Sequence, residues 1–461
     1  MAKSKTKTKS KSSKKSKTSR KKASLKTARA KKPKKSSKTA KKAAAKKKKK
    51  RTTKKVSKKS PKKASSAKSR KKAPQKLATE IEKPLIPLNK PFQLFMEVWN
   101  PKNESFFMGI RKLLSQYSVP GKTDKQKEAS SAQIIEKIES AMQKESLSPE
   151  LVEQLSERFS PDRIRKMSSI MAMGPRATIR LNILKADIQG FAQSKVAKDL
   201  KVKRCHYSPW AFDVGGNINP REHPVFDRGL FEIEDEASQL ATLLLNPRPG
   251  QRVLDLCARE GDHTLAISAL MKNKGSLFVY DANSERLKTL KVRAQRAGVS
   301  NIRILSDSQI GEVKSLDAVL IDAPCSGTGV LARQPEIKWR FRKEDLPKIQ
   351  KLQAALLREG ARKLKLGGHL IYMTFSLNRS ENEAQIEHFL KHAHNSYRLV
   401  PAIEYFKECI LPYLDNFYGL QMTEEQLLSF AESDPFFLSL PDVHACNGMF
   451  AAIIERTRIS S

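Results

Sequence analysis

Short apolar runs alternate with amphipathic helical patterns from about residue 250 onward, and this alternation limits the possible folds more than any other feature. Each run is rich in Val, Ile and Leu and too short for a helix, as is typical of a buried parallel strand. We expect strands at residues 253–256, 277–281, 302–305, 318–321 and 370–373, with helices at 284–296, 346–364 and 383–392. This spacing predicts an α/β domain with a doubly wound parallel sheet over residues 245–461.

The most distinctive stretch of this domain is an apolar run followed at once by an acid, a proline, a thiol and two glycines. Ala318–Ile321 leads directly into Asp322-Ala-Pro-Cys-Ser-Gly-Thr-Gly329. Ligands of open α/β sheets bind at the carboxyl ends of the strands. An acid and a thiol there can hydrogen-bond a planar base and attack it, so Asp322 and Cys325 are the candidate catalytic residues. The alternative is a satisfied acid and a small buried cysteine without chemical function.

Acids also end the other predicted strands. Asp281 is placed to accept hydrogen bonds from ribose hydroxyls, and Asp307 to hold an adenine amino group. Asp255, near the end of the first strand, and the turn Cys257–Thr264 after it lie where the backbone of a nucleotide-like cofactor should pass. The pattern indicates an adenosine-type cofactor. Its candidate binding residues are Asp255, Cys257, Ala258, Arg259, Glu260, Gly261, Asp262, His263, Asp281, Asp307 and Asp322.

The first 80 residues have a different character. They contain 37 lysines and arginines and one acid, Glu80, and so carry +36 of the chain's net charge of +43. With almost no large apolar side chain, residues 1–85 are expected to be a disordered tail. In composition the tail resembles those of linker-histone-like proteins, and it should bind RNA or DNA phosphates with little sequence preference. A solubilising or targeting role is the alternative, since Lys46–Arg51 matches a nuclear localisation run.

Two smaller segments lie between the tail and the α/β domain. Residues 86–171 are expected to form a bundle of short helices, with a loop at 118–131. Residues 172–244, which include an alternating strand at 177–182, are expected to form a small α/β subdomain that binds RNA. A solvated charged face is the alternative for its basic residues. These are Arg176, Arg180, Lys201, Lys203 and Arg204.

The five cysteines contain no CxxC pair, which argues for a reducing compartment and against a zinc site or a disulfide framework. Cys205, Cys409 and Cys446 have no motif around them and are expected to be packing residues. No apolar run approaches the ~18 residues of a membrane helix, and the N-terminus lacks a secretory h-region. We expect a monomer without membrane or metal partners, located in the cytoplasm, or in the nucleolus of a eukaryote.

These motifs resemble the Sun-type family of RNA cytosine-5 methyltransferases, which includes bacterial ribosomal small-subunit methyltransferase B. The resemblance covers roughly residues 172–457 and is strongest over Asp322–Trp339, the family's fourth motif. Further matching pieces are Gly229–Gln239, Val253–Ala258, Arg180-Leu-Asn182 and Asn447–Ala452. It implies a Rossmann-like catalytic domain, S-adenosylmethionine as methyl donor, and RNA, above all ribosomal RNA, as substrate.

The chain departs from the family pattern at two places. Where the family has Cys-Ala-Ala-Pro-Gly-Gly-Lys-Thr, this chain has Cys257-Ala-Arg-Glu-Gly-Asp-His-Thr264, whose two acids should weaken binding of the donor's carboxylate. Where the family has its nucleophile in Thr-Cys-Ser, this chain has Phe375. The resemblance assigns Cys325 to product release. However, DNA cytosine-5 methyltransferases attack with the cysteine of a Pro-Cys pair at this strand end, which leaves Cys325 as the thiol in position to attack.

Three functional hypotheses follow from the sequence. The first is an RNA cytosine-5 methyltransferase that attacks with Cys325 or modifies another atom. The second is a catalytically inactive descendant that acts as an RNA-binding module, because Phe375 occupies the nucleophile position. The third is a nucleoid-type protein whose properties are set by its tail.

Overall fold

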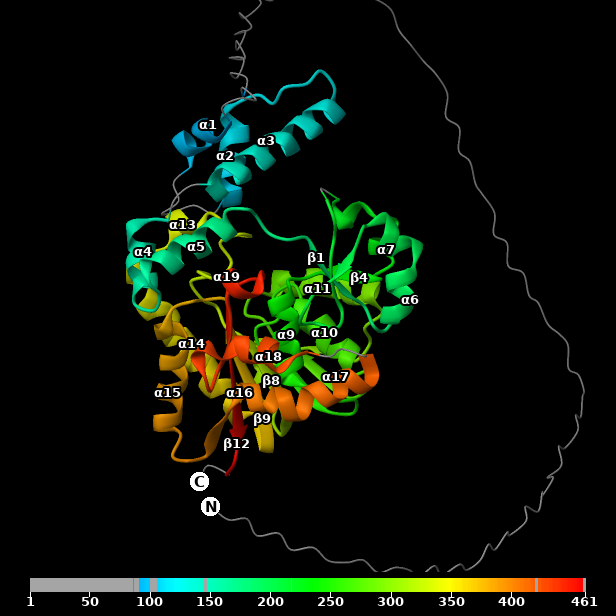
Figure 1. The fold of residues 1–461 in the computed structure, drawn as a ribbon, viewed down its shortest axis with the longest axis vertical. Helices are drawn as coiled ribbons and strands as arrows, with labels where there is room; N and C mark the ends of the chain where they lie inside the picture. Colours follow the sequence, from blue (N-terminus) through cyan, green and yellow to red (C-terminus); the bar gives the residue numbers. More distant parts are fainter. Residues whose placement is uncertain are drawn as a thin grey trace, which may run out of the picture. The chain divides into compact units, whose positions relative to one another are not determined.

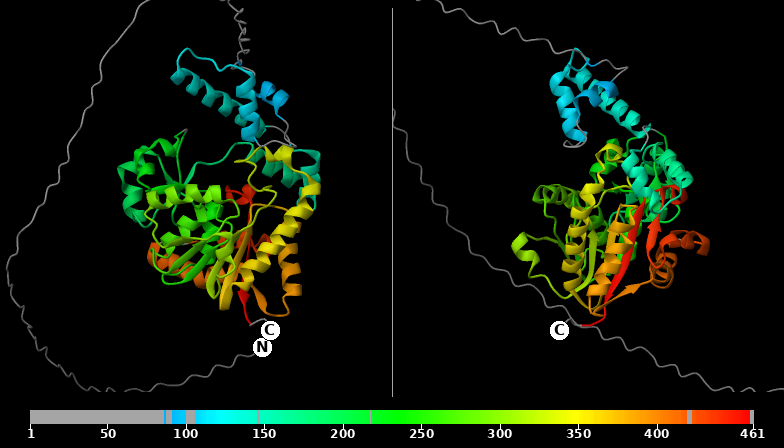
Figure 2. Two further views of the ribbon diagram at one scale, coloured as in Figure 1. Left: turned by 180° about the vertical axis from the view of Figure 1, so that it is seen from behind. Right: turned by 90° about the vertical axis from the view of Figure 1, so that its left-hand side faces the viewer.

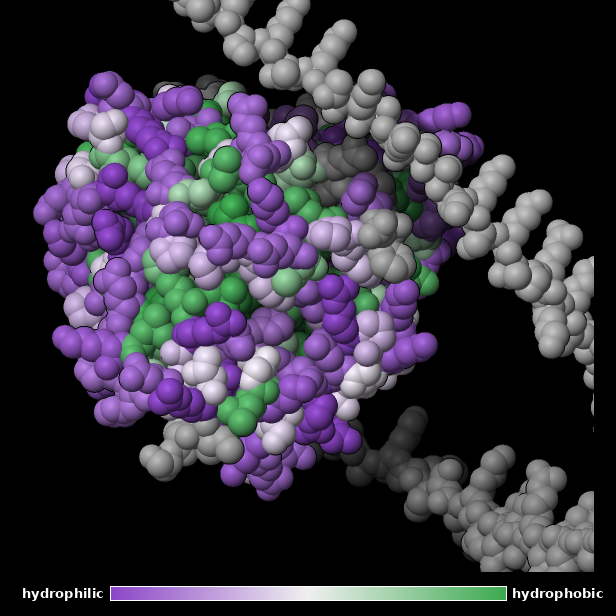
Figure 3. Space-filling model, turned by 60° about the horizontal axis from the view of Figure 1, so that its bottom comes forward, coloured by the Kyte–Doolittle hydropathy of each residue, from purple (hydrophilic) through white to green (hydrophobic). Residues whose placement is uncertain are grey.

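The computed structural model describes residues 86, 91–99, 106–144, 147–216, 218–418 and 422–458. The predicted tail therefore lies outside the described residues. Within the described ranges, no helix combines the length and apolar character that crossing a membrane would require. Figure 3 shows one face of the molecule, where apolar residues form small patches among charged ones.

A large sheet forms the centre of the α/β domain, with strands in the order β10-β12-β9-β8-β5-β6-β7 and with β11 paired to β12 (Figure 1). The pairs β5–β6, β5–β8, β6–β7 and β8–β9 are parallel, which confirms the predicted parallel sheet for the strands that we expected. These strands are β5 (Arg252–Asp255), β6 (Ser276–Val279), β7 (Ile302–Ile304), β8 (Leu316–Asp322) and β9 (Leu364–Thr374).

The sheet continues beyond β9 with strands that we did not predict. They are β10 (Tyr397–Val400), β11 (Phe437–Ser439) and β12 (Met449–Arg456). β12 runs antiparallel to β9, β10 and β11. The sheet is therefore mixed at this end, beyond the parallel strands that we predicted. β12 lies between strands on both sides, and its apolar residues are buried on both faces, which accounts for a continuous apolar run without alternation.

Alternate residues of the central strands enter two separate cores, one on each face of the sheet. Figures 1 and 2 show helices on both faces of that sheet. Val253 and Leu320 join one core, whereas Leu254 and Ile321 join the other. The first core also contains residues of α9 (Glu236–Leu245), α10 (Asp262–Leu270) and α11 (Ser284–Ala297), and the second contains residues of α14 (Leu346–Arg362) and α15 (Glu383–His392). Helices thus cover both faces, as a doubly wound fold requires.

The small subdomain contains an antiparallel sheet in the order β2-β3-β1-β4. Its elements are β1 (Thr178–Leu181), α6 (Ile188–Gln193), α7 (Lys195–Asp199), β2 (Lys203–Arg204), β3 (Ala211–Asp213), α8 (Pro224–Asp227) and β4 (Phe231–Ile233). Lys203 and Arg204 are exposed, but Arg180 is buried and forms an ion pair with Glu234. Arg180 was wrongly predicted as a residue of an RNA-contacting surface, because its guanidinium group is committed to that buried carboxylate.

The predicted bundle at 86–171 was wrong as a single unit, because its helices belong to two different cores. α1 (Pro91–Val98), α2 (Phe106–Gln116) and α3 (Asp124–Lys144) contribute to a core of their own. α4 (Pro149–Ser156) and α5 (Pro161–Met171) pack on the second core of the α/β domain. Ser148 and Ser160 are the N-caps of α4 and α5, and the side chain of each accepts a hydrogen bond from a backbone N–H of the first turn. The loop predicted at 118–131 ends earlier, since α3 begins at Asp124.

The remaining helices are short connections. They are α12 (Asp307–Ile310), α13 (Ile337–Arg340), α16 (Ala402–Tyr405), a π-helical segment (Phe406–Ile410), α17 (Leu411–Tyr418), α18 (Glu424–Leu428), α19 (Pro441–His444) and the 3₁₀ segments Pro220–Glu222, Lys343–Asp345, Arg379–Glu381 and Ser429–Ser433.

The Arg180–Glu234 ion pair yields a prediction about stability. Because both side chains are buried, Arg180→Met leaves an uncompensated carboxylate in the interior and should lower the free energy of unfolding by about 3–5 kcal/mol. The double variant Arg180→Met/Glu234→Leu removes both charges and should recover most of this loss. Urea unfolding of the three proteins measures the effect, and a single variant within 1 kcal/mol of wild type would contradict it.

Candidate active site

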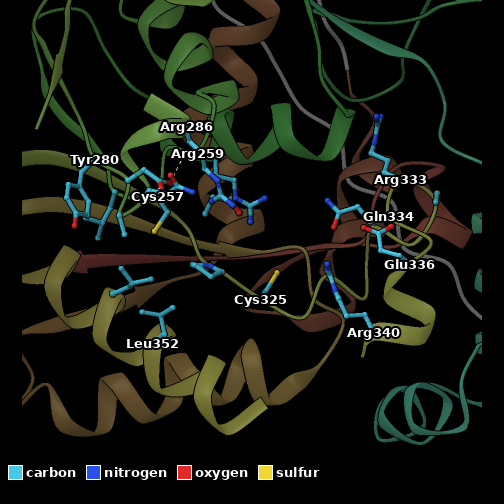
Figure 4. A pocket seen from close by; sticks show the side chains of 18 of the residues that line it. Cys257, Arg259, Tyr280, Arg286, Cys325, Arg333, Gln334, Glu336, Arg340 and Leu352 are labelled. Carbon is cyan, nitrogen blue, oxygen red and sulfur yellow. Dashed lines mark hydrogen bonds and ion pairs between the residues drawn. The ribbon is translucent and has the colours of Figure 1, made fainter. Parts of the chain in front are cut away.

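Two adjoining cavities lie at the carboxyl ends of β5, β6 and β8. The larger has a volume of about 850 Å³ and the smaller about 210 Å³. In Figure 4, Cys257 and Tyr280 lie at one end of the larger cavity and Arg333 and Arg340 at the other, with Cys325 between them. The residues that line both cavities are Arg259, Cys325, Arg333, Gln334 and Arg340.

The carboxylate of Asp281, two residues after β6, is held in place in the larger cavity by the backbone. Its Oδ2 accepts a hydrogen bond from the Arg259 N–H at 2.9 Å, and its Oδ1 accepts one from the Asn283 N–H at 2.8 Å. A carboxylate has about four lone-pair sites, so each oxygen keeps capacity for another donor. This arrangement suits two adjacent hydroxyl groups, such as those of a ribose.

The turn between β5 and α10 needs glycine at Gly261. Its φ is +96°, and a Cβ atom there would lie 2.1 Å from Leu290 Cδ1. Arg259 also has a positive φ of 50°, and its Nε lies 3.4 Å from Asp322 Oδ2. The charge of Asp322 raises the pKa of the Arg259 guanidinium, which therefore stays protonated inside the larger cavity.

The acids of this turn are arranged differently from our expectation. Asp262 lines only the smaller cavity, and its Oδ1 accepts a hydrogen bond from Arg293 Nη2 at 2.5 Å. Burial opposes ionisation of Asp262, but Arg293 outweighs it and holds the pKa of this carboxyl below its usual range. Glu260 is exposed and lines neither cavity. The predicted repulsion of the donor's carboxylate is therefore reduced, because Arg293 compensates one of the two acids.

Five further candidates lie outside the lining of both cavities: Asp255, Ala258, Gly261, His263 and Asp307. Asp255 is buried and accepts a hydrogen bond from Thr264 Oγ1 at 2.6 Å, and burial raises its pKa to about 6. His263 points into the interior, where its Nδ1 lies 3.1 Å from Thr242 Oγ1. Asp307 is exposed and accepts a hydrogen bond from the hydroxyl of Tyr280, which does line the larger cavity.

Cys325 lies where the two cavities meet, and Asp322 lines the larger cavity only. Asp322, the last residue of β8, is 3% exposed, and its Oδ1 has no hydrogen-bond partner. Cys325 lines both cavities, and burial together with the nearby Glu381 raises the pKa of its thiol to about 12. The thiol is therefore protonated at neutral pH and must lose its proton before it can attack a carbon atom.

Phe375 lies in the wall of the smaller cavity together with Cys325. Its carbonyl accepts a hydrogen bond from the Gly329 N–H at 2.8 Å and so ties the end of β9 to the loop after β8. The side chain in the family's nucleophile position thus faces the same space as Cys325, but it offers an aromatic ring in place of a thiol.

A buried hydrogen-bond network centred on Glu381 lies close to Cys325, and no sequence motif predicted it. Glu381 is fully buried and accepts hydrogen bonds from the N–H and hydroxyl of Ser326, the hydroxyl of Ser376 and the side-chain amides of Asn378 and Gln353. These donors come from three segments of the chain. The network therefore fixes the loop after β8 against the loop after β9. Glu381 can be recognised as part of the site only from its tertiary contacts, because no motif in the sequence marks it.

Two sequence motifs from opposite ends of the domain meet at the smaller cavity. Asp235, the N-cap of α9, accepts hydrogen bonds at one oxygen from the Ala237 N–H and the Asn447 N–H. Glu234, Asp235 and Asn447 all line this cavity. The small subdomain and the C-terminal segment thus contribute directly to the candidate base-binding side of the site.

The other cysteines divide into two groups. Cys205 and Cys446 are buried, as predicted for packing residues, whereas Cys409 is exposed, so the packing role predicted for it was wrong. Among the residues that the structure describes, no group of three or more His, Cys, Asp or Glu side chains could hold a metal ion.

Residues 242–454 match the sequence model of a family described as 16S rRNA methyltransferase RsmB/F. This domain belongs to the RsmB/F family. The RsmB/F domain contains the catalytic candidates Asp322 and Cys325. The α/β fold of this domain agrees with the Rossmann-like fold that the resemblance implied.

Curated relatives and solved structures support this assignment. The chain is 33% identical over 257 residues to a probable ribosomal RNA small subunit methyltransferase B from Synechocystis. This match covers 54% of this chain and 57% of that protein. It is 31% identical to the mouse 28S rRNA (cytosine-C(5))-methyltransferase over 52% of this chain and 49% of that protein. The chain thus spans about half the length of the curated relatives that it matches.

A methyltransferase homologue from Pyrococcus horikoshii has a similar structure. It is 28% identical, with a TM-score of 0.52, and the match covers 67% of this chain and all of that chain. NSun6 from the same organism, solved with the S-adenosylmethionine analogue SFG, has a TM-score of 0.54 at 17% identity and covers 68% of this chain and 99% of that one. The latter likeness shows the fold alone.

Proposed function

We propose that the RsmB/F domain transfers a methyl group from S-adenosylmethionine to C5 of a cytosine in RNA, and that the substrate is ribosomal RNA. The observation that carries the proposal is the position of Cys325 at the junction of a large cavity suited to the donor and a small one suited to a single base, with Asp322 beside it in the lining of the large cavity. The small cavity falls below the ~300–1,000 Å³ of common ligand pockets, as expected for one ring. The names of the relatives favour this function over the inactive alternative.

The residues of the larger cavity fit the proposed donor. Asp281 offers its free lone pairs to the ribose hydroxyls, and Cys257 and Tyr280 line the same end of the cavity. The Arg259 guanidinium supplies a positive charge that a carboxylate would accept. When bound, S-adenosylmethionine supplies an electrophilic methyl group.

Cys325 and Asp322 have separate roles in the proposed reaction. After Cys325 loses its proton, Sγ forms a bond to C6 of the cytosine, and the electron pair of the C5–C6 double bond makes C5 nucleophilic. Asp322 holds the N3/N4 edge of the base. Once C5 carries the methyl group, a base removes the C5 proton, the double bond reforms and the Sγ–C6 bond breaks to restore the thiolate.

The raised pKa of Cys325 predicts how its reactivity depends on pH. Because the thiol pKa is about 12, the thiolate fraction should rise about tenfold per pH unit and about a hundredfold between pH 7 and pH 9. Alkylation of the full chain by iodoacetamide, with Cys325 quantified by peptide mass spectrometry, measures this fraction. Levelling of the rate near pH 8.5, the pKa of an unperturbed thiol, would contradict the prediction.

We also propose that residues 1–80 increase the affinity for RNA without adding specificity. Because this segment carries +36, its removal should weaken binding to any RNA and flatten the slope of log affinity against log salt concentration. Titrations at several salt concentrations compare the full chain with the variant lacking residues 1–80. An unchanged slope would show that the segment does not contact phosphates.

A further inference from the structure

A third cavity of about 620 Å³ lies between α14, α15 and β10, and it shares no lining residue with either catalytic cavity. α14 and α15 pack side by side on the same face of the sheet (Figure 1). Leu352 and Leu356 of α14 line the larger catalytic cavity, whereas Arg358 and Arg362 of the same helix line the third one. Leu352 and Arg362 are ten positions apart, which is about 15 Å along the helix axis.

Basic side chains surround this cavity from three elements. Arg358 and Arg362 lie one turn apart on α14, His388 and His392 lie one turn apart on α15, and Arg458 follows β12. No acidic residue is among the residues that line it within the described part of the chain, although Arg362 forms an ion pair with Glu359 outside the lining. Because residues beyond the tail are only mildly basic, this concentration of basic groups is local and favours an anionic ligand.

Two aromatic side chains line the cavity. Phe389 and Tyr397 line it, with ring centroids 5.2 Å apart, and Phe389 is anchored in the core of the domain. A rigid aromatic surface beside arginines is the combination with which proteins bind single-stranded nucleic acid, because bases stack on the rings while guanidinium groups bind phosphates. The volume lies in the range of a nucleotide-sized ligand.

We infer that this cavity binds one nucleotide of a single-stranded RNA segment, with the base against Tyr397 and the phosphate against Arg358. The lysine-rich tail is unsuitable as the occupant, because it is positively charged, as are the arginines that line the cavity. The site gives the protein a second point of contact with RNA, away from the atoms that react. Binding there requires no methyl transfer, so it can hold or fail independently of the proposed enzyme activity.

Photocrosslinking tests this inference on the full chain. A single-stranded RNA with 5-iodouridine at single positions is irradiated with the protein, and the crosslinked peptides are identified by mass spectrometry. We expect a crosslink at Tyr397 or Phe389, and Arg358→Glu should reduce its yield at least fivefold. The control is Arg303→Glu, an exposed arginine on β7 with the same change of charge, which should leave the yield unchanged.

The inference is overturned if no RNA position crosslinks to these rings. It is also overturned if Arg358→Glu and Arg303→Glu reduce the crosslink equally, which would indicate a non-specific effect of charge. If an acidic peptide competes for the crosslink at lower concentration than RNA, the cavity is a protein-binding site and the RNA assignment is wrong. Thermal melting of each variant confirms that it is folded.

Discussion

Replacing Cys325 by alanine is expected to abolish methyl transfer to RNA and the formation of a covalent complex with RNA that contains 5-fluorocytosine. Cys325 is the thiol at the junction of the two cavities, and Phe375 cannot form the bond to C6. Loss of a nucleophile removes the covalent route, so the rate should fall by roughly a thousandfold or more. Transfer of a radioactive methyl group from the donor to RNA measures the effect.

The matched control for this substitution is Cys409→Ala. Cys409 is exposed and lines neither cavity, so activity should remain at the wild-type level. A trapped RNA complex with Cys325→Ala would contradict the prediction, because it would show that another thiol attacks and that Cys325 acts in product release, as the family resemblance implies.

Asp281→Ala is expected to abolish detectable binding of S-adenosylmethionine. The carboxylate is oriented by two backbone N–H groups, and two hydrogen bonds to ribose hydroxyls at about 1.5–3 kcal/mol each correspond to at least a hundredfold loss of affinity. Titration calorimetry of the full chain measures it. Asp307→Ala should cost less than tenfold in affinity, because Asp307 lies outside the cavity lining and its carboxylate accepts a hydrogen bond from Tyr280, which does line the cavity. Equal losses for both variants would contradict the assignment.

The sequence predicted the central strands because their burial on both faces requires continuous apolar runs. It did not predict the direction of β12, since an antiparallel strand buried between two neighbours has the same apolar pattern as a parallel one. It also placed α4 and α5 with the wrong neighbours. Amphipathic periodicity shows that a helix has an apolar face, but not which core that face joins.

The candidate site was predicted in part. Strand-end positions located Asp281, Asp322 and Cys325 correctly at one edge of the sheet, because parallel strands end on the same side. The orientation of individual side chains depends on tertiary contacts that the sequence does not show. His263 faces Thr242, Asp262 is held by Arg293, and Arg180 is held by Glu234.

The most direct test of the account is the identity of the residue that bonds to the target base. Wild-type protein is incubated with S-adenosylmethionine and RNA containing 5-fluorocytosine. In this base, fluorine replaces the C5 proton that must be removed, so the covalent complex persists. The digested complex is analysed by mass spectrometry. The account predicts an adduct at Cys325 that carries the transferred methyl group. The absence of an adduct in wild type, together with one gained by Phe375→Cys, would contradict it and favour the inactive descendant.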